Sequence, residues 1–311
     1  MISRRVLIVG DPGFVGAHLA RRCVADGHEV HVLAGANGTG AAGADPIAVH
    51  RVALDDPAAV LGCLDRVVPE YIFDCTGDRA GWHRGPLADR VAMGKGIRRL
   101  TTLIRAASLC REPPRAFIRT GSIAEYGAGP VPYREQQREQ PDTADGVELV
   151  AKTQLAAMIA PSLPFRLATA RLALVYGAGQ DPRFLIPSLV GANLLGQPSR
   201  VCRRADRHDV LHVSDAVAAL VRLAEEPPAP GAIVNVGSDT SVAVDELAVA
   251  IARITDKEPR WDRDEQFDAV EQRMSIERIV AGWGWVPRMT LARGLAEVVA
   301  EQREAALTVA A

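Results

Sequence analysis

Several features that mark common classes of protein are missing from this 311-residue chain. The five cysteines are scattered and show no C-x-x-C spacing, which argues against a zinc cluster or disulfides and indicates free, buried thiols in a reducing compartment. Lysine and arginine total 36 against 38 aspartates and glutamates, so no basic surface is expected for nucleic acid or an anionic membrane. No run of about 18 apolar residues occurs that would span a membrane. We therefore expect a cytoplasmic protein that binds neither nucleic acid nor a membrane.

Apolar, β-branched runs of strand length alternate with alanine-rich stretches of helix length through the first part of the chain. The predicted strands are 5–10, 29–34, 71–75, 116–121 and 171–177, and the predicted helices are 18–26, 57–64, 88–109 and 147–160. Continuous apolar strands that alternate with helices are typical of a parallel sheet covered on both faces. The sequence therefore predicts an α/β fold with a doubly wound parallel sheet of the Rossmann type.

The pattern changes after about residue 175. Loops and short helices follow, with an isolated strand at 232–237 and two helical patterns at 244–254 and 289–301. We interpret this part as a smaller C-terminal substrate-binding lobe packed on the edge of the sheet. The predicted domain limits are 1–175 for the dinucleotide-binding domain, with 208–240 returning to it, and 176–207 with 241–311 for the lobe.

Three glycines, Gly10, Gly13 and Gly16, fall where the first strand ends and the first helix begins. A helix N-terminus offers free N–H groups to a pyrophosphate, and residues without a Cβ let the backbone approach the ligand closely. A glycine triplet alone can be no more than a turn, but here it follows an apolar strand and opens a helix. We predict that this turn binds a dinucleotide, with Phe14 and Val15 as further cofactor-binding residues.

From this turn onward the chain resembles the extended short-chain dehydrogenase/reductase family of the NAD-dependent epimerase/dehydratase type. The matching segments follow the family's order over nearly the whole chain: VGDPGFVG (9–16), TGSIAEYG (120–127), PYREQ (132–136), Lys152 of the Y-x-x-x-K motif, RLALVYGAGQ (171–180), DVLHVSDAV (209–217), NVGSD (235–239) and GWVPRMTLARGL (284–295). The resemblance implies a nicotinamide dinucleotide as cofactor. It also leaves open a homodimer, formed through the helices near 88–109 and 147–160.

The end of the second strand bears on the choice of cofactor. In NAD-preferring members of the family an acidic residue at this position binds the adenosine ribose, and this chain has Ala34 instead. The substitution removes the repulsion that would exclude a 2′-phosphate, although no arginine stands beside it to clamp that phosphate. We predict that NADP(H) is favoured over NAD(H).

The resemblance implies roles for three residues. Ser122, four residues before Tyr126, matches the serine that binds the substrate oxygen, and Lys152, one of only three lysines, matches the residue that holds the cofactor ribose. Where the family has its catalytic tyrosine, four residues before the lysine, this chain has Glu148. A carboxyl group of the ordinary kind is ionised at neutral pH, so Glu148 is a poor proton donor unless it is strongly desolvated. Glu148 could then act as a base, accept a hydrogen bond that orients another group, or simply face solvent.

Neither of the nearby tyrosines is expected to replace the missing one. Tyr126 belongs to the Y-G turn and is expected to be packed, and Tyr133 stands nineteen residues from Lys152. The proton for a reduced carbonyl would then come from water, from Ser122 or from the substrate itself.

Three determinants that the family uses for sugar nucleotides are absent. Ile123 and Ala124 replace the Asp-Glu pair of 4,6-dehydratases, His208 replaces the arginine before the late strand, and Leu174 replaces the asparagine of R-x-x-N. These losses favour a carbonyl substrate without a nucleotide. Four arginines remain that could still supply positive charge: Arg203, Arg204, Arg207 and Arg260.

Two histidines and two aspartates lie close together in the sequence, namely His208, Asp209, His212 and Asp215. Such residue types can bind a metal, but these positions match a strand of the family, so a structural or substrate-lining role is expected and no metal site. Ser122, His212 and Asp215 do not indicate a hydrolase, because the G-x-S-x-G motif is missing.

The sequence therefore predicts an NAD(P)H-dependent ketoreductase that acts on a small-molecule carbonyl substrate and lacks the catalytic tyrosine. The alanine- and arginine-rich composition and the family precedent of aromatic polyketide ketoreductases suggest secondary metabolism, such as antibiotic biosynthesis. Two alternatives remain open. One is a nucleotide-sugar epimerase or 4-ketoreductase, and the other is a catalytically silent dinucleotide-binding protein that senses redox state.

Overall fold

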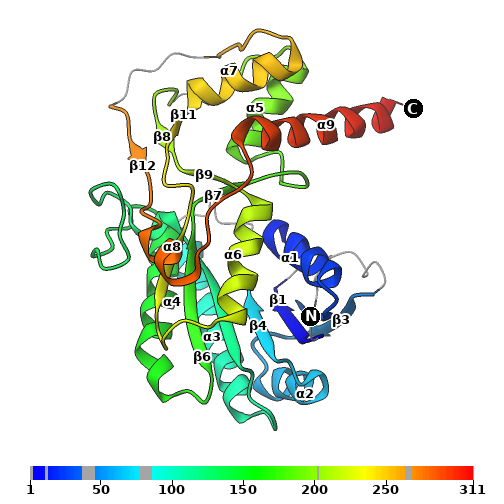
Figure 1. Ribbon diagram of the computed structural model, residues 1–311, viewed down its shortest axis with the longest axis vertical. Helices are drawn as coiled ribbons and strands as arrows, with labels where there is room; N and C mark the ends of the chain where they lie inside the picture. The colour runs from blue at the N-terminus through cyan, green and yellow to red at the C-terminus, as the bar shows by residue number, and fades with distance from the viewer. Residues whose placement is uncertain are drawn as a thin grey trace.

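The computed structural model describes residues 3–10, 13–36, 46–76, 86–201, 203–262 and 268–310, without the side chains of 86–93 and 308–310. A seven-stranded sheet with the order β10-β6-β5-β4-β1-β2-β3 forms its centre, and all neighbouring strands are parallel (Figure 1). Its strands are β1 (Arg5–Val9), β2 (Glu29–Gly35), β3 (Ala48–Val52), β4 (Tyr71–Asp74), β5 (Ala116–Ser122), β6 (Arg166–Leu172) and β10 (Ile233–Val236). The strand order reverses between β1 and β4, which is where parallel sheets of this kind bind ligands. The predicted doubly wound sheet is confirmed.

Helices cover both faces of the sheet, as the alternating sequence pattern predicts. One face carries α2 (Pro57–Val67), α3 (Pro86–Leu109) and α4 (Ala144–Ile159), and the other carries α1 (Phe14–Ala25) and α6 (Val213–Glu225). Alternate residues of one strand serve the two faces: in β1, Leu7 packs on the side of α2 and α3, and Ile8 packs on the side of α1 and α6. No helix in the described part of the chain is long and apolar enough to cross a membrane.

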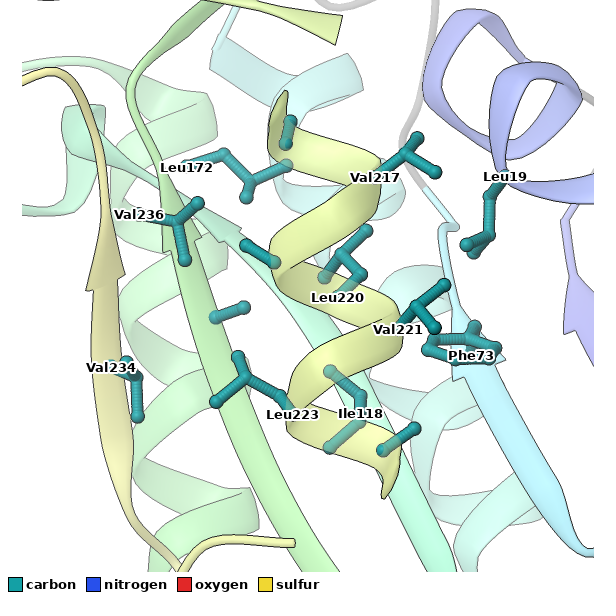
Figure 2. Close-up of a cluster of buried hydrophobic side chains, with 14 of the residues drawn as sticks. Leu19, Phe73, Ile118, Leu172, Val217, Leu220, Val221, Leu223, Val234 and Val236 are labelled. Atoms are coloured by element: carbon teal, nitrogen blue, oxygen red, sulfur yellow. The ribbon is translucent and has the colours of Figure 1, made fainter. Parts of the chain in front are cut away.

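Helix α6 fills the centre of one of these faces (Figure 2). Nine of its thirteen residues are buried, and the four more exposed ones recur at helical spacing along one narrow stripe: Ser214, Ala218, Arg222 and Glu225. The buried side chains pack against strands β4, β5, β6 and β10 and against α1, through the side chains labelled in Figure 2: Leu19, Phe73, Ile118, Leu172, Val217, Leu220, Val221, Leu223, Val234 and Val236. Burial of one such aliphatic side chain is worth about 1.5–3 kcal/mol. Neither α6 nor β3 is among the elements that the sequence pattern predicts.

The strand predicted at 171–177 is divided in the structure. β6 begins at Arg166, and β7 (Leu174–Tyr176) leaves the sheet to pair with β9 (Val210–His212). The first part of β6 is rich in alanine, which has little preference for strands, so its periodicity gives no strand signal. The chain leaves the carboxyl end of β6 directly into the C-terminal lobe.

The lobe has its own hydrophobic core, separate from the two cores of the sheet. It contains α5 (Leu185–Leu194), α7 (Val244–Thr255), α9 (Leu291–Ala310) and a three-stranded sheet of β11 (Val242–Ala243), β8 (Arg207–His208) and β12 (Glu271–Gln272). Part of 241–311 returns to the main sheet: Met274, Ile279 of α8 (Glu277–Trp283) and Trp285 lie in the core around α6. The predicted domain limits therefore remain a prediction, with residues 274–285 packed on the sheet side.

Three of the cysteines, Cys23, Cys63 and Cys110, are buried free thiols, and Cys75 is partly buried. Burial raises the pKa of the Cys23 thiol to about 12, which keeps it protonated and unreactive. Cys202 lies outside the described residues.

Candidate functional site

The turn after β1 has the backbone geometry that a dinucleotide requires. Gly10 has φ +121°, a conformation that favours glycine, and a Cβ there would lie 3.2 Å from the carbonyl oxygen of Cys75 at the end of the neighbouring strand. The Gly10 N–H donates to the Leu33 carbonyl at 3.0 Å, which ties the turn to β2. Residues 11 and 12 lie outside the described ranges.

Helix α1 begins at Phe14, directly after Gly13, at the carboxyl edge of the sheet. Gly16 in its first turn is buried, and a Cβ there would make contact with Ile8 and Cys75 at 3.6 and 3.7 Å, so the helix packs closely on the sheet. Val15 packs against the same core. The N-terminus of α1 therefore lies at the point where the strand order reverses. The backbone N–H groups of its first turn are available there to bind a pyrophosphate.

Ala34 is buried at the end of β2, and its partner in register on β3 is Arg51. Neighbouring strands lie about 4.8 Å apart, and residues in register point to the same face of the sheet. The fold thus brings an exposed arginine beside Ala34, although the two are seventeen residues apart in the chain. Arg51 could not be found from the sequence pattern, because the half-exposed strand AVHRV shows no strong apolar alternation.

Ser122 ends β5 and caps the short 3-10 helix of residues Ile123–Glu125. Its Oγ accepts the Ala124 N–H at 3.2 Å, and its own N–H donates to Glu125 Oε1 at 3.0 Å. Glu125 is fully buried and forms an ion pair with Arg171 of β6 at 2.8 Å. The position of Ser122 is therefore fixed by a capping box and by a buried ion pair behind it.

The same arginine links the serine turn to helix α4. Arg171 Nη2 lies 2.5 Å from Glu139 Oε1, and that carboxylate accepts a hydrogen bond from Gln154 Nε2 of α4 at 2.7 Å. Burial opposes ionisation of Glu139, but the hydrogen bonds led by that from Arg171 outweigh it and hold the pKa of Glu139 below its usual value. A continuous set of ion pairs and hydrogen bonds therefore joins the turn of Ser122 to the helix that carries Lys152.

Glu148 and Lys152 lie one turn apart on α4, which starts at a Thr143 N-cap. The carboxylate oxygen Oε1 of Glu148 is 2.5 Å from Nζ of Lys152, and the two side chains are 14% and 6% exposed. Glu148 thus does not simply face solvent. It neutralises a buried lysine at the spacing where the family has its tyrosine and lysine.

The side chains of Tyr126 and Tyr133 are packed inside the protein, and both hydroxyls are hydrogen-bonded. Their rings stack at 4.8 Å, and both are almost fully buried. The Tyr126 hydroxyl donates to Asn235 Oδ1 at 2.7 Å, and the Tyr133 hydroxyl donates to the Gly127 carbonyl at 2.8 Å. Burial raises the pKa of both phenols, so neither is poised to release a proton at neutral pH.

The other two tyrosines are also buried, and the chain has four in all. Tyr71 is the first residue of β4 and lies at the amino end of the parallel strands, whereas Ser122 lies at their carboxyl end. Tyr176 packs edge-on against His212 in the region where the lobe meets the sheet, and burial raises its pKa. No tyrosine of this chain takes the place of the one missing at position 148.

The cluster of histidines and aspartates consists of groups with structural partners. His212 is the N-cap of α6, and His208 Nδ1 lies 3.1 Å from Gln272 Oε1. The two aspartates accept backbone N–H groups, Asp209 from Ser238 and Met274 and Asp215 from Arg288 and Met289. Among the described residues there is no group of three or more histidines, cysteines, aspartates or glutamates that could hold a metal.

Three of the four lobe arginines named from the sequence form ion pairs within the lobe. Arg203 pairs with Asp206 at 2.6 Å, Arg204 with Asp245 at 2.8 Å and Arg207 with Glu246 at 3.3 Å. Arg260 donates to the Gly196 carbonyl at 3.2 Å. Much of the positive charge in this region is therefore balanced by acidic neighbours.

A narrow pocket lies at the carboxyl ends of β1 and β4, under α2 and α3, and its lining is mostly apolar. It also contains the buried Asp74, whose carboxylate accepts the N–H and hydroxyl of Thr76 at 3.0 and 2.5 Å. The lining residues are Val9, Leu54, Val60, Asp74, Thr76, Arg99, Leu100 and Leu103. No sequence motif marks these lining residues as a site. They come from several elements that are distant in the sequence, and three of them lie on α3.

Comparison with known proteins agrees with this geometry. The family model described as "NAD dependent epimerase/dehydratase family" matches residues 6–237. The chain is 26% identical to dTDP-6-deoxy-L-talose 4-dehydrogenase (NAD(P)(+)) of Kitasatospora kifunensis, over 97% of this chain and 96% of that protein. It is 28% identical to UDP-glucose 4-epimerase of Mycolicibacterium smegmatis, over 95% and 97% of the two chains. The structure of Thermus thermophilus UDP-glucose 4-epimerase in complex with NAD superposes with a TM-score of 0.83 at 21% identity, over 97% of this chain and 99% of that one. Since the family model covers most of its length, this chain belongs to the NAD dependent epimerase/dehydratase family and is an enzyme that uses a nicotinamide dinucleotide.

Proposed function

We propose that this oxidoreductase uses NADPH to reduce a ketone of a small-molecule substrate, without a phenol in its site. One observation carries the proposal: an ion pair of the partly buried Glu148 with the buried Lys152 stands at the spacing of the family's tyrosine and lysine, while all four tyrosines are packed elsewhere. Secondary metabolism, including antibiotic biosynthesis, is the proposed setting.

Each residue of the proposed site has a distinct task. When bound, the dinucleotide supplies the hydride. The ammonium group of Lys152 has three N–H donors. One is directed at Glu148, and the other two can bind the ribose hydroxyls. Ser122 donates its hydroxyl proton to the oxygen of the ketone as negative charge develops there, and takes a proton back from water, so that it ends unchanged.

The preference for NADP(H) is part of the proposal. Ala34 adds no negative charge at the end of β2, and the register of the sheet places the Cα of Arg51 beside it. A guanidinium group is well suited to bind a 2′-phosphate. Arg51→Ala should weaken NADPH binding about tenfold and leave NADH binding unchanged, as measured by calorimetric titration of both. Equal losses for the two cofactors would contradict this role.

The losses at Ile123, Ala124 and Leu174 and the ion pairs of the lobe arginines support a carbonyl substrate without a nucleotide. The second candidate is a nucleotide-sugar 4-ketoreductase or epimerase, and the names of the two curated relatives favour it. Arg260, which has a carbonyl partner, would be the residue to test for a diphosphate contact in that case.

The deciding experiment measures NADPH oxidation with a panel of ketones, together with binding of UDP and dTDP. Turnover of ketones that carry no nucleotide supports the proposal. Turnover confined to nucleotide-linked 4-keto sugars, together with tight UDP or dTDP binding, supports the second candidate. Cofactor binding without any turnover would leave the silent dinucleotide-binding protein as the better description.

A homodimer through α3 and α4 is also proposed. Val147 and Met158 lie on the outer side of α4 and are 44% and 74% exposed. Light scattering on Met158→Glu would show a monomer if this helix forms the dimer contact.

A further inference from the structure

Helix α3 contributes a glycine to the site, at a position that the sequence motifs do not mark. Gly96 packs against the part of α4 that carries Glu148 and Lys152. A Cβ built at Gly96 would overlap Oε1 of Glu148 and would lie 2.8 Å from both Cε and Nζ of Lys152. The carboxylate of Glu148 therefore occupies the space that any other residue at position 96 would fill with its side chain.

The atoms that a larger residue would strike are the ends of two flexible side chains, and no backbone atom is among the three nearest. Such ends move at little cost in folding free energy. A glycine inside a helix, by contrast, destabilises that helix relative to alanine. A methyl group at position 96 should therefore cost little stability, and it should displace the two charged groups of the site.

We propose that Gly96 is a positioning residue, which leaves room for the Glu148 carboxylate to close on Lys152 and so sets the place of the lysine ammonium. The role assigned to this position rests on the proposed function, in which Lys152 holds the cofactor ribose. Because the carboxylate is directed at α3 and at the lysine, Glu148 acts through Lys152 and does not donate the proton to the substrate.

The chain offers a matched control on the same helix. Gly94 is exposed, and a Cβ built there meets nothing within 4 Å. Gly94→Ala and Gly96→Ala carry the same change in helix propensity, so a difference between the two variants reports the contact with the ion pair alone.

The first measurement needs no cofactor. Acetylation of the free protein by a low concentration of acetic anhydride, followed by mass spectrometry, gives a rate for each of the three lysines. Lys152 should react slowly in wild type and in Gly94→Ala, because it is buried and paired, and several-fold faster in Gly96→Ala. Lys257, which is exposed, serves as the internal reference, and thermal unfolding checks that both variants are folded.

The second measurement is the NADPH affinity of the same variants, followed by calorimetry. Gly94→Ala should match wild type, and Gly96→Ala should bind about tenfold more weakly, as expected when a charge-assisted hydrogen bond is displaced. The double variant Gly96→Ala/Glu148→Asp should recover part of the affinity, since aspartate is shorter by one methylene and removes the overlap with the carboxylate, while the contact with the end of Lys152 remains.

Equal Lys152 acetylation in the two glycine variants would overturn the proposed geometry. Equal NADPH affinity, or no recovery in the double variant, would overturn the positioning role. Wild-type protein that binds no dinucleotide at all would refute the proposed function, and the acetylation result would still decide whether Gly96 sets the place of Lys152.

Discussion

Two ion pairs lie near the carboxyl end of β5, and they differ in what surrounds them. Arg171 and Glu125 are both completely buried, with a further carboxylate from Glu139 on the arginine. Lys152 and Glu148 lie on one helix and remain 6% and 14% exposed. The first pair is sealed inside the protein and fixes the turn of Ser122. The second remains slightly open, so a ligand can compete for its atoms. We infer that the first serves mainly stability and the second mainly cofactor binding.

The largest effect is expected from breaking the sealed pair. Arg171→Met keeps most of the side-chain volume but leaves Glu125 buried without its cation, and this kind of change costs about 3–5 kcal/mol in the free energy of unfolding. Urea unfolding followed by circular dichroism measures the loss. Glu125→Gln should cost less, because an amide carries no charge. A loss below about 1 kcal/mol for Arg171→Met would remove the distinction between the two pairs.

The next effect concerns catalysis next to the sealed pair. Ser122→Ala should lower kcat about 10²–10³-fold, because the developing alkoxide loses a hydrogen bond that strengthens in the transition state. Glu148→Gln should lower kcat much less, since Glu148 is not the proton donor, and its effect through Lys152 should fall on NADPH binding. Steady-state kinetics on the best ketone substrate compare the two variants. A large loss for Glu148→Gln beside a mild one for Ser122→Ala would reverse the assigned roles.

Breaking the open pair should affect binding more than stability. Lys152→Ala should weaken NADPH binding by about 1.5–3 kcal/mol, the usual worth of a hydrogen bond to a charged group. Calorimetric titration gives the affinity, and thermal unfolding without cofactor gives the stability. If the unfolding temperature falls as far as in Arg171→Met while affinity is unchanged, Lys152 is a structural residue.

The smallest effect is a pH dependence within the sealed network. The pKa of Glu139 is held below its usual value, so its ionised form stabilises the folded protein above about pH 4.3, and this contribution is lost as the pH falls through the folded-state pKa. Glu139→Gln should therefore be less stable than wild type at pH 7, by about 1 kcal/mol or less, and the difference should shrink toward pH 3. A difference that grows on acidification would contradict this sign.

What could be predicted from the sequence depends on local patterns. Gly10, Gly13 and Gly16 and the position of Lys152 follow from a strand–turn–helix pattern and a short motif, and the comparisons confirm the family that these motifs indicated. The roles assigned to Ser122, Glu148 and Lys152 remain predictions.

The residues that could not be predicted act across long sequence separations. Arg51 comes to Ala34 through strand register, and Gly96 comes to Glu148 through the packing of α3 on α4. The buried pair of Glu125 with its arginine on β6 joins the short helix after β5 to the neighbouring strand, and no periodicity signals such a contact. Helix α6 is different, because its four more exposed residues recur at helical spacing and its segment alone could have predicted it.

The place of α6 also governs how this protein can be synthesised. The sheet face that holds Phe73 and Ile118 is covered by α6, and the edge beside β6 is occupied by β10, which ends at Val236. A ribosome-bound chain that has released only residues 1–175 would carry that apolar face open to water. Translation adds about 5–20 residues per second, so the nascent domain waits several seconds for the segment that closes it. We expect chaperones to bind it during that interval, and a fragment that ends at residue 175 should aggregate.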